Sequence, residues 1–121
     1  LQTQVSLPGA YRGVDEWYRR ASLFILTSKY EGTPNAALEA MANQTPILIT
    51  ETCGEMRHII QDKVNGLITS RAEKEVREKL DWAYDNQQLT VDIGEAGRDT
   101  VEKYGRQSVA KKWVDFLLQL N

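Results

Sequence analysis

The sequence has few of the residues on which several classes of protein depend. Among its 121 residues there is one cysteine, Cys53, and one histidine, His58. A single cysteine cannot close an internal disulfide, and a single histidine excludes a histidine-rich metal site. The lone cysteine fits a reducing compartment, so a cytoplasmic location is expected. No apolar run approaches the roughly 20 residues that a membrane-spanning helix needs.

An excess of charge of one sign is also lacking, since 15 lysines and arginines face 17 aspartates and glutamates. Nucleic-acid binding needs a basic stripe interleaved with aromatic residues; none is present, so no nucleic-acid partner is expected. Apolar residues, 41% of the chain, recur along its whole length, which excludes disorder and predicts a single domain over residues 1–121. Trp17, Trp82 and Trp113 are predicted to lie in its core.

Strand and helix patterns alternate over residues 5–69. Short apolar runs bounded by turn residues predict strands at residues 5–7, 22–27, 46–50 and 67–69. Helices are predicted between them, at residues 14–21, 35–42 and 55–61. Alternation of this kind implies an α/β fold with a parallel sheet, and the runs at 22–27 and 46–50 are typical of strands covered on both faces.

The rest of the chain is predicted to form a helical C-terminal tail, with helices at residues 70–84, 89–104 and 107–120. The first opens with SRAE (70–73), the pattern of a capping box. Gly94 and Gly97 weaken the second. The third has an apolar stripe that is expected to pack in the core, made of Val109, Trp113, Phe116, Leu117 and Leu120.

The loop after the predicted strand at 22–27 leads into a helix and offers an anion site. Ligands of open α/β sheets bind beyond the carboxyl ends of the strands. Thr33 is predicted to cap the helix with Pro34 in its first position, and the helix N-terminus offers unpaired N–H groups and a partial positive charge. Gly32 lets the backbone approach a ligand closely. A diphosphate is the kind of anion that such a site accepts.

Two glutamates flank this anion site. Glu39 lies four residues after Asn35 on the same helical face, and its carboxylate can accept two hydrogen bonds from a vicinal diol such as a ribose. Glu31 lies in the loop near the strand end, where a second hydroxyl-bearing ring has room. The spacing therefore indicates a sugar nucleotide, with a purely structural role for the two glutamates as the alternative.

The segment EGTPNAALEAMA (31–42) resembles the E-x7-E motif of the retaining GT-B glycosyltransferases of family 4. The sequence on either side of this segment also resembles that of the family. EWYRRA (16–21) resembles the helix before the motif, and TSKYEG (27–32) the passage from strand to loop. PILI (46–49) follows at the family's spacing, and DKVNGLI (62–68) resembles its D-G-x-N-G-L turn. The resemblance runs over residues 5–104.

The resemblance implies a Rossmann-like domain that binds a UDP-, GDP- or ADP-sugar for polysaccharide or glycoconjugate synthesis, without a metal or other cofactor. Glu31 would contact hydroxyl groups of the transferred sugar and is the candidate catalytic residue. Glu39 would hold the ribose diol, and Ala10 would line the base pocket through its backbone. The backbone of four further residues would face the sugar and the diphosphate: Gly32, Thr33, Pro34 and Asn35.

The resemblance also implies parts that these 121 residues do not include. The family's acceptor-binding domain and the basic pair that neutralises the leaving diphosphate would lie upstream, so the chain is expected to be a C-terminal fragment without activity of its own. Its C-terminal helices would reach back to the upstream domain, an alternative to core packing for the stripe at 109–120. The full-length protein would dock peripherally on the inner face of the membrane.

Four positions depart from the family pattern. Gln44 and Lys63 stand where the family usually has glycine. Gly54 and Glu55 stand at the family's Gly-Gly pair, so that Glu55 departs from it, and His58 replaces the glutamate that follows the pair. A capping or surface role is expected for His58, and a filler role for Cys53.

Two other functions fit the same sequence. One is a non-catalytic nucleotide-sugar-binding module, or a subunit that needs a partner chain. The other is a flavodoxin-like interaction domain, which would have a phospho-acceptor aspartate at a strand end; none follows Leu26 or Ile49.

Overall fold

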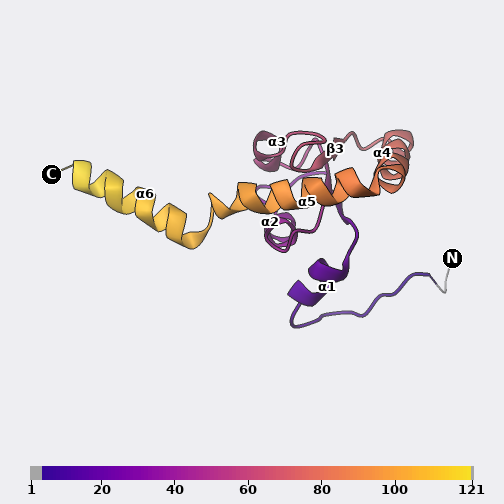
Figure 1. Cartoon of the computed structure of the whole chain (residues 1–121), viewed down its shortest axis with the longest axis horizontal. Helices are drawn as coiled ribbons and strands as arrows, with labels where there is room; N and C mark the ends of the chain where they lie inside the picture. Colours follow the sequence, from indigo (N-terminus) through magenta and orange to yellow (C-terminus); the bar gives the residue numbers. More distant parts are fainter. Residues whose placement is uncertain (1–3, 121) are drawn as a thin grey trace.

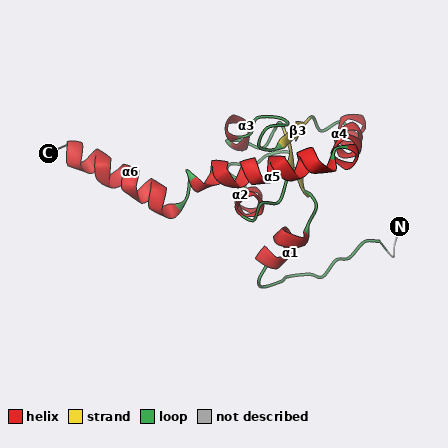
Figure 2. Cartoon of the chain, in the orientation of Figure 1, coloured by secondary structure: helices red, strands yellow, loops and turns green. Residues whose placement is uncertain are grey.

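A computed structural model of the chain describes residues 4–120. Its three strands form one parallel sheet in the order β1-β2-β3, with β1 at Phe24–Leu26, β2 at Ile47–Thr50 and β3 at Leu67–Thr69. The helices are α1 (Asp15–Arg20), α2 (Asn35–Ala42), α3 (Met56–Ile59), α4 (Glu73–Asp85), α5 (Gln87–Glu102) and α6 (Arg106–Gln119). Figures 1 and 2 show this arrangement. The predicted α/β class, the parallel sheet and the helical C-terminal tail are confirmed.

The core lies on both faces of β2, the central strand. All four of its residues are buried, as the apolar run at 46–50 predicts. Because side chains alternate across a strand, Ile47 and Ile49 pack with Met41 of α2 on one face. Leu48 packs on the other face with Leu67 of β3 and with residues of α4 and α5.

Strand β1 differs from the prediction of a strand covered on both faces. It is shorter, and Ile25 is 44% exposed although its register partner Leu48 is fully buried. On the face of the sheet that carries Ile25, the core cluster of α4 and α5 packs on Leu48 and Leu67 and does not include Ile25.

The strand predicted at residues 5–7 is wrong. The segment is irregular, and Leu7 is 90% exposed. Figure 1 shows it running away from the sheet below α1. An apolar alternation of three residues forms a strand only where a sheet edge receives it, and this segment reaches none.

The two glycines of α5 allow close packing. A Cβ atom at Gly94 would overlap the carbonyl oxygen of Gln44 and would lie 3.1 Å from the ring of Pro46. At Gly97 it would lie 3.1 Å from the carbonyl oxygen of Asn65. The glycines that weakened the sequence-based prediction therefore let α5 lie against the rest of the domain.

Two predicted helix caps are wrong. Pro34 itself is the N-cap of α2, and no side chain caps that helix. At the start of α4, the Ser70 hydroxyl accepts a hydrogen bond from Ala72 N–H at 3.1 Å. Ala72 is the N-cap residue of α4, so Ser70 lies two residues before the position that a capping serine occupies. The capping box does not form because the helix begins later than the pattern predicts.

The predicted burial of Trp17, Trp113 and the α6 stripe is also wrong, whereas Trp82 packs against the core cluster that contains Leu48 and Leu67. Trp113 is 61% exposed, Trp17 is exposed, Trp82 is half-buried, and no residue of α6 is buried. In Figure 1, α6 projects away from the sheet, so nothing within residues 4–120 covers it. None of the helices in these residues is both long and apolar enough to cross a bilayer.

Two residues that replace the family's glycines adopt left-handed backbone conformations, Gln44 at φ 62° and Lys63 at φ 61°. The left-handed conformation destabilises the folded state by about 1–2 kcal/mol for a residue with a Cβ atom. Glycine adopts it without strain, and the greater entropy that glycine loses on folding costs about 0.5–1 kcal/mol. We therefore expect Gln44→Gly to raise the free energy of unfolding by about 0.5–1 kcal/mol in urea titrations.

A matched control for that prediction is Gln88→Gly. Gln88 is exposed in α5, where glycine lowers stability by up to about 1 kcal/mol. A loss of stability in both variants would contradict the assignment of backbone strain to Gln44.

Candidate functional site

Two loops meet at the carboxyl ends of β1 and β2. The hydroxyl groups of Thr50 and Thr52 both donate to the carbonyl oxygen of Ser28, at 3.0 and 2.9 Å. The Glu55 N–H donates to the carbonyl oxygen of Gly32 at 3.2 Å. These bonds hold residues 27–34 against residues 51–55, so the edge predicted to bind the ligand is built from both loops.

Gly54 is the point of closest approach between the two loops. Its φ of +48° lies in the left-handed region, and a Cβ atom there would overlap the carbonyl oxygens of Glu31 and Gly32. Only glycine fits both the conformation and the space. No pattern in the sequence predicts this contact, because it joins two loops that are more than 20 residues apart.

Glu31 is held in place by its own loop. Its Oε1 accepts a hydrogen bond from the Ser28 hydroxyl at 2.7 Å, and the residue is half-buried. Such a charge-assisted bond fixes the carboxylate before any ligand arrives. The geometry suits a group that orients hydroxyl groups of a ligand.

The start of α2 lies next to Glu31. The carbonyl oxygen of Pro34 accepts the first bonds of the helix, from Ala37 N–H at 3.1 Å and Leu38 N–H at 3.3 Å. The N–H groups of Asn35 and Ala36 precede these bonds and point out of the helix end. Gly32 and Thr33 are exposed, whereas Pro34 is buried. An anion can therefore approach this helix end from the loop side.

Glu39 lies one turn further along α2 and is exposed. Its Oε2 accepts a hydrogen bond from the hydroxyl group of Tyr18 in α1, at 3.3 Å. Burial, followed by the carboxylates of Glu39 and Asp15, raises the pKa of Tyr18, so this phenol stays protonated and remains a donor. Tyr18 is not among the predicted site residues, because no motif in the sequence links α1 to α2.

Ala10, the predicted base-pocket residue, is not brought to this edge. It is exposed, and among the described hydrogen bonds none joins residues 4–12 to the loops at 27–34 or 51–55. The structure thus brings together Glu31, Glu39 and the backbone between them, and leaves Ala10 apart from them.

A small hollow of about 180 Å³ lies beside Gly54. His58 lines it, with Nε2 accepting a hydrogen bond from Nε of Arg57 at 3.3 Å. The other lining residues are Glu51, Thr52, Gly54, Glu55 and Arg57. Cys53 is fully buried below this loop, with its Sγ 3.6 Å from Oγ1 of Thr50, and so fills space as the sequence-based analysis expects.

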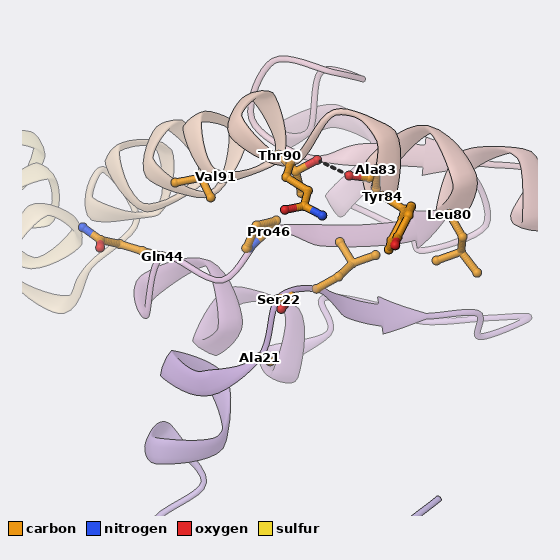
Figure 3. Close-up of a pocket in the computed structure, with 11 residues that line it drawn as sticks. Ala21, Ser22, Gln44, Pro46, Leu80, Ala83, Tyr84, Thr90 and Val91 are labelled. Atoms are coloured by element: carbon orange, nitrogen blue, oxygen red, sulfur yellow. Dashed lines mark hydrogen bonds between the residues drawn. The ribbon is translucent and has the colours of Figure 1, made fainter. Parts of the chain in front are cut away.

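A larger hollow, of about 520 Å³, lies at the opposite end of the strands (Figure 3). Ser22 and Pro46, which precede β1 and β2, line it together with residues of α4 and α5. The hydroxyl group of Thr90 in its wall donates to the carbonyl oxygen of Ala83 at 3.1 Å. Because this hollow faces the amino ends of the strands, it is separate from the edge that bears Glu31 and Glu39.

Comparison with known proteins identifies the family to which the sequence is similar. Residues 1–100 match the protein family described as Glycosyl transferases group 1. The poly(ribitol-phosphate) alpha-N-acetylglucosaminyltransferase of Staphylococcus aureus is 26% identical over 117 residues, which cover 95% of this chain and 24% of that protein. The chain spans between 11% and 33% of the length of the curated relatives that it matches.

Solved structures agree in fold. The C-terminal domain of LpcC, a glycosyl transferase group 1 family protein from Francisella tularensis, is 28% identical with a TM-score of 0.73, covering 84% of this chain and 53% of that chain. HepE from Anabaena, solved in complex with UDP, is 18% identical with a TM-score of 0.77, covering 86% of this chain and 29% of that chain. The fold is therefore that of GT-B glycosyltransferases.

Proposed function

The chain belongs to the glycosyl transferases group 1 family, and from this premise we propose that residues 31–39 bind the nucleotide-diphosphate sugar of a retaining, family 4 glycosyltransferase. The reaction class is transfer of the sugar to a growing polysaccharide or glycoconjugate. The observation that carries the proposal is the placement of two carboxylates, Glu31 and Glu39, on either side of the open N-terminus of α2.

Each part of this arrangement matches one part of a nucleotide sugar. The open N–H groups at Asn35 and Ala36 suit the diphosphate. The Tyr18 hydroxyl group donates to Oε2 of Glu39, so Oε1 remains available to a ligand. A carboxylate can accept hydrogen bonds from both hydroxyl groups of a ribose diol. Glu31, fixed by Ser28, orients hydroxyl groups of the transferred sugar. The complex of the Anabaena structure with UDP supports a nucleoside diphosphate as the ligand class.

Catalysis in this proposal requires groups outside these 121 residues. The leaving diphosphate gains a further negative charge as the bond to the sugar breaks, and cationic side chains must stabilise it. Lys29 of the first loop and Arg57 of α3 do not occupy the family's positions for that role. We propose that an acceptor-binding domain and a basic pair complete the enzyme and that the chain alone turns over no substrate.

Further expectations belong to the same proposal. The donor site needs no metal ion, and the full-length protein works in the cytoplasm, docked peripherally at the inner face of the membrane. The alternative is a non-catalytic nucleotide-sugar-binding module or a subunit completed by a partner chain. The exposed stripe of α6, which includes Trp113 and Phe116, is compatible with contact to another domain in either case.

The test is calorimetric titration of the chain with UDP-, GDP- and ADP-glucose. We expect one of the three to bind, and Glu39→Ala to weaken it by about tenfold or more, because two hydrogen bonds to a charged group are lost. Bound ligand should also raise the melting temperature of the unmodified chain by mass action.

Two matched variants make the test specific. Tyr18→Phe removes only the hydroxyl that contacts Glu39, so it should change affinity much less than Glu39→Ala. Glu95→Ala removes an exposed carboxylate of α5 and should change nothing. Equal affinity of the unmodified chain and Glu39→Ala, or no binding of any of the three donors, would reject the site.

A further inference from the structure

A series of hydroxyl groups crosses from one loop of the candidate site to the other and ends at Glu31. Thr50 is the last residue of β2, and Thr52 follows it in the second loop. Their hydroxyl groups donate to the carbonyl oxygen of Ser28 at 3.0 and 2.9 Å. The hydroxyl group of Ser28 in turn donates to Oε1 of Glu31 at 2.7 Å. We call Thr50, Thr52 and Ser28 the hydroxyl chain.

The hydroxyl chain orients Ser28 from two sides. A carbonyl oxygen has two lone pairs, and the two threonine hydroxyl groups use both of those on Ser28. These bonds fix the backbone of Ser28, and the bond to Glu31 fixes its side chain. The direction in which the Ser28 hydroxyl points is therefore set by residues more than 20 positions further along the chain.

The carboxylate of Glu31 depends on this support. Within residues 4–120, the Ser28 hydroxyl is its only hydrogen-bond or ion-pair partner. The ammonium group of the neighbouring Lys29 lies over the Tyr30 ring instead, 5.5 Å from its centre. A glutamate side chain has several rotatable bonds, and a ligand that must immobilise such a side chain loses affinity. Ser28 removes part of this cost before a ligand arrives.

The bond from Ser28 also determines which oxygen of Glu31 remains open. Oε1 is engaged, whereas Oε2 has no partner among the described residues. A carboxylate oxygen accepts hydrogen bonds and donates none, so Oε2 suits the hydroxyl group of an uncharged sugar. Because the carboxylate is fixed, its open oxygen favours a hydroxyl group that approaches from one direction.

The hydroxyl chain does not extend to the part of the site proposed for the nucleotide. Among the described hydrogen bonds, none joins Ser28, Thr50 or Thr52 to residues 35–39. Glu39 has a different support, the hydroxyl group of Tyr18 in α1. The two carboxylates are therefore held independently, and loss of the hydroxyl chain should affect Glu31 without affecting Glu39.

Thr52 is the member of the hydroxyl chain whose role is more than structural. Thr50 is fully buried, and its Oγ1 also lies 3.6 Å from the Sγ of Cys53, so it belongs to the core. Thr52 is half-buried in the loop. The two loops are also joined by the bond from the Glu55 N–H to the Gly32 carbonyl oxygen, which does not involve Thr52.

We propose that Thr52, acting through Ser28, is a positioning residue for the transferred sugar. The inference rests on the proposed function, because Glu31 needs a sugar to orient. Thr52 touches no ligand itself; it holds Ser28 so that Oε2 of Glu31 meets a sugar hydroxyl group. The second loop thus contributes to binding of the sugar, whereas the start of α2 and Glu39 bind the nucleotide.

The test compares a nucleotide sugar with the same nucleotide lacking its sugar. Calorimetry is performed with the donor that binds the unmodified chain, among UDP-, GDP- and ADP-glucose, and with the matching UDP, GDP or ADP. Thr52→Val keeps the shape of the side chain and removes its hydroxyl group. We expect it to weaken the glucose donor by about fivefold and Ser28→Ala by about tenfold, with the affinity for the diphosphate unchanged in both.

Three further variants separate positioning from a structural role. Thr52→Ser restores the hydroxyl group and should restore the affinity for the donor. Glu39→Ala should weaken the donor and the diphosphate alike. Thr90→Val removes a hydroxyl group that donates to the carbonyl oxygen of Ala83, far from the site. It should lower the melting temperature and leave the ratio of the two affinities unchanged.

A measurement without ligand tests the first step directly. Three-bond nuclear magnetic resonance couplings of Glu31 report whether its side chain occupies one rotamer or several. We expect one rotamer in the unmodified chain and in Thr52→Ser, and averaging in Thr52→Val and Ser28→Ala. One rotamer in all four proteins would overturn the inference.

The calorimetric outcomes also distinguish this inference from the proposed function. If no glucose donor binds the unmodified chain, the proposed function is rejected and the inference with it. If a donor binds and Glu39→Ala weakens it, the proposed function stands. The inference alone then falls if Thr52→Val leaves the donor affinity unchanged, weakens donor and diphosphate by the same factor, or is not rescued by Thr52→Ser.

Discussion

Replacing Gly54 with alanine is expected to lower the free energy of unfolding by about 3 kcal/mol and to abolish nucleotide-sugar binding. Two effects add. The left-handed conformation costs an L-residue about 1–2 kcal/mol, and the new methyl group overlaps the carbonyl oxygens of Glu31 and Gly32. The overlap involves backbone atoms, so relief requires the loops to move apart.

Binding is expected to fail because the two loops form one site. Separation breaks the bond from Glu55 N–H to Gly32 and shifts Glu31 away from Ser28. Urea unfolding measures the loss of stability, and calorimetry with the donor that binds the unmodified chain measures the loss of affinity at a temperature where the variant is folded.

The control is Gly13→Ala. Gly13 has the same kind of conformation, with φ +84°, but nothing lies within 4 Å of a Cβ atom built there. Gly13→Ala should lower the free energy of unfolding only by the conformational cost of about 1–2 kcal/mol, and its affinity for the donor should be unchanged. Similar losses in both variants would mean that the contact between the loops contributes nothing.

Replacing Gly94 with alanine is expected to destabilise the domain by about 2 kcal/mol, although alanine is the better helix former by about 1 kcal/mol. The methyl group would overlap the carbonyl oxygen of Gln44 and press on the ring of Pro46. The helix must then move off the loop between α2 and β2, which opens the core around Ile93. Thermal and urea unfolding measure the change.

Gly97→Ala in the same helix is the matched control. Its methyl group would lie 3.1 Å from the Asn65 carbonyl oxygen and 3.6 Å from Cε of Met41, a flexible side chain. The gain in helix propensity should largely offset this crowding and leave a change within about 1 kcal/mol. A stabilised Gly94→Ala variant would contradict the packing of α5 on this loop.

Local patterns of the sequence correctly predict those elements whose structure depends little on the neighbouring parts of the fold. The run at 46–50 is apolar up to Ile49, and all four residues of β2 are buried, including Thr50. Helix α2 begins and ends where its alanines and leucine predict. The segment from Glu31 to Asn35 follows a strand and precedes a helix, so its position at the carboxyl edge depends only on the chain direction.

Predictions that depend on what lies next to an element are the ones that are wrong. The segment at 5–7 has a strand pattern but meets no sheet edge, so it stays irregular. The stripe of α6 has a core pattern, but no described element packs on it. The same holds for Ile25, which the core cluster on its face of the sheet does not include. A pattern records which side chains prefer burial, not whether a partner is present.

The sequence by itself determined the α/β class, the family resemblance and the placement of Glu31 and Glu39 around one helix start. All of these follow from residues within about ten positions of one another, or from the order of elements. Only the tertiary structure decided that Gly54 packs on Gly32, that Tyr18 contacts Glu39, and that Thr52 donates to Ser28. These features depend on segments far apart in the chain that approach within a few ångströms, which a pattern along the sequence does not encode.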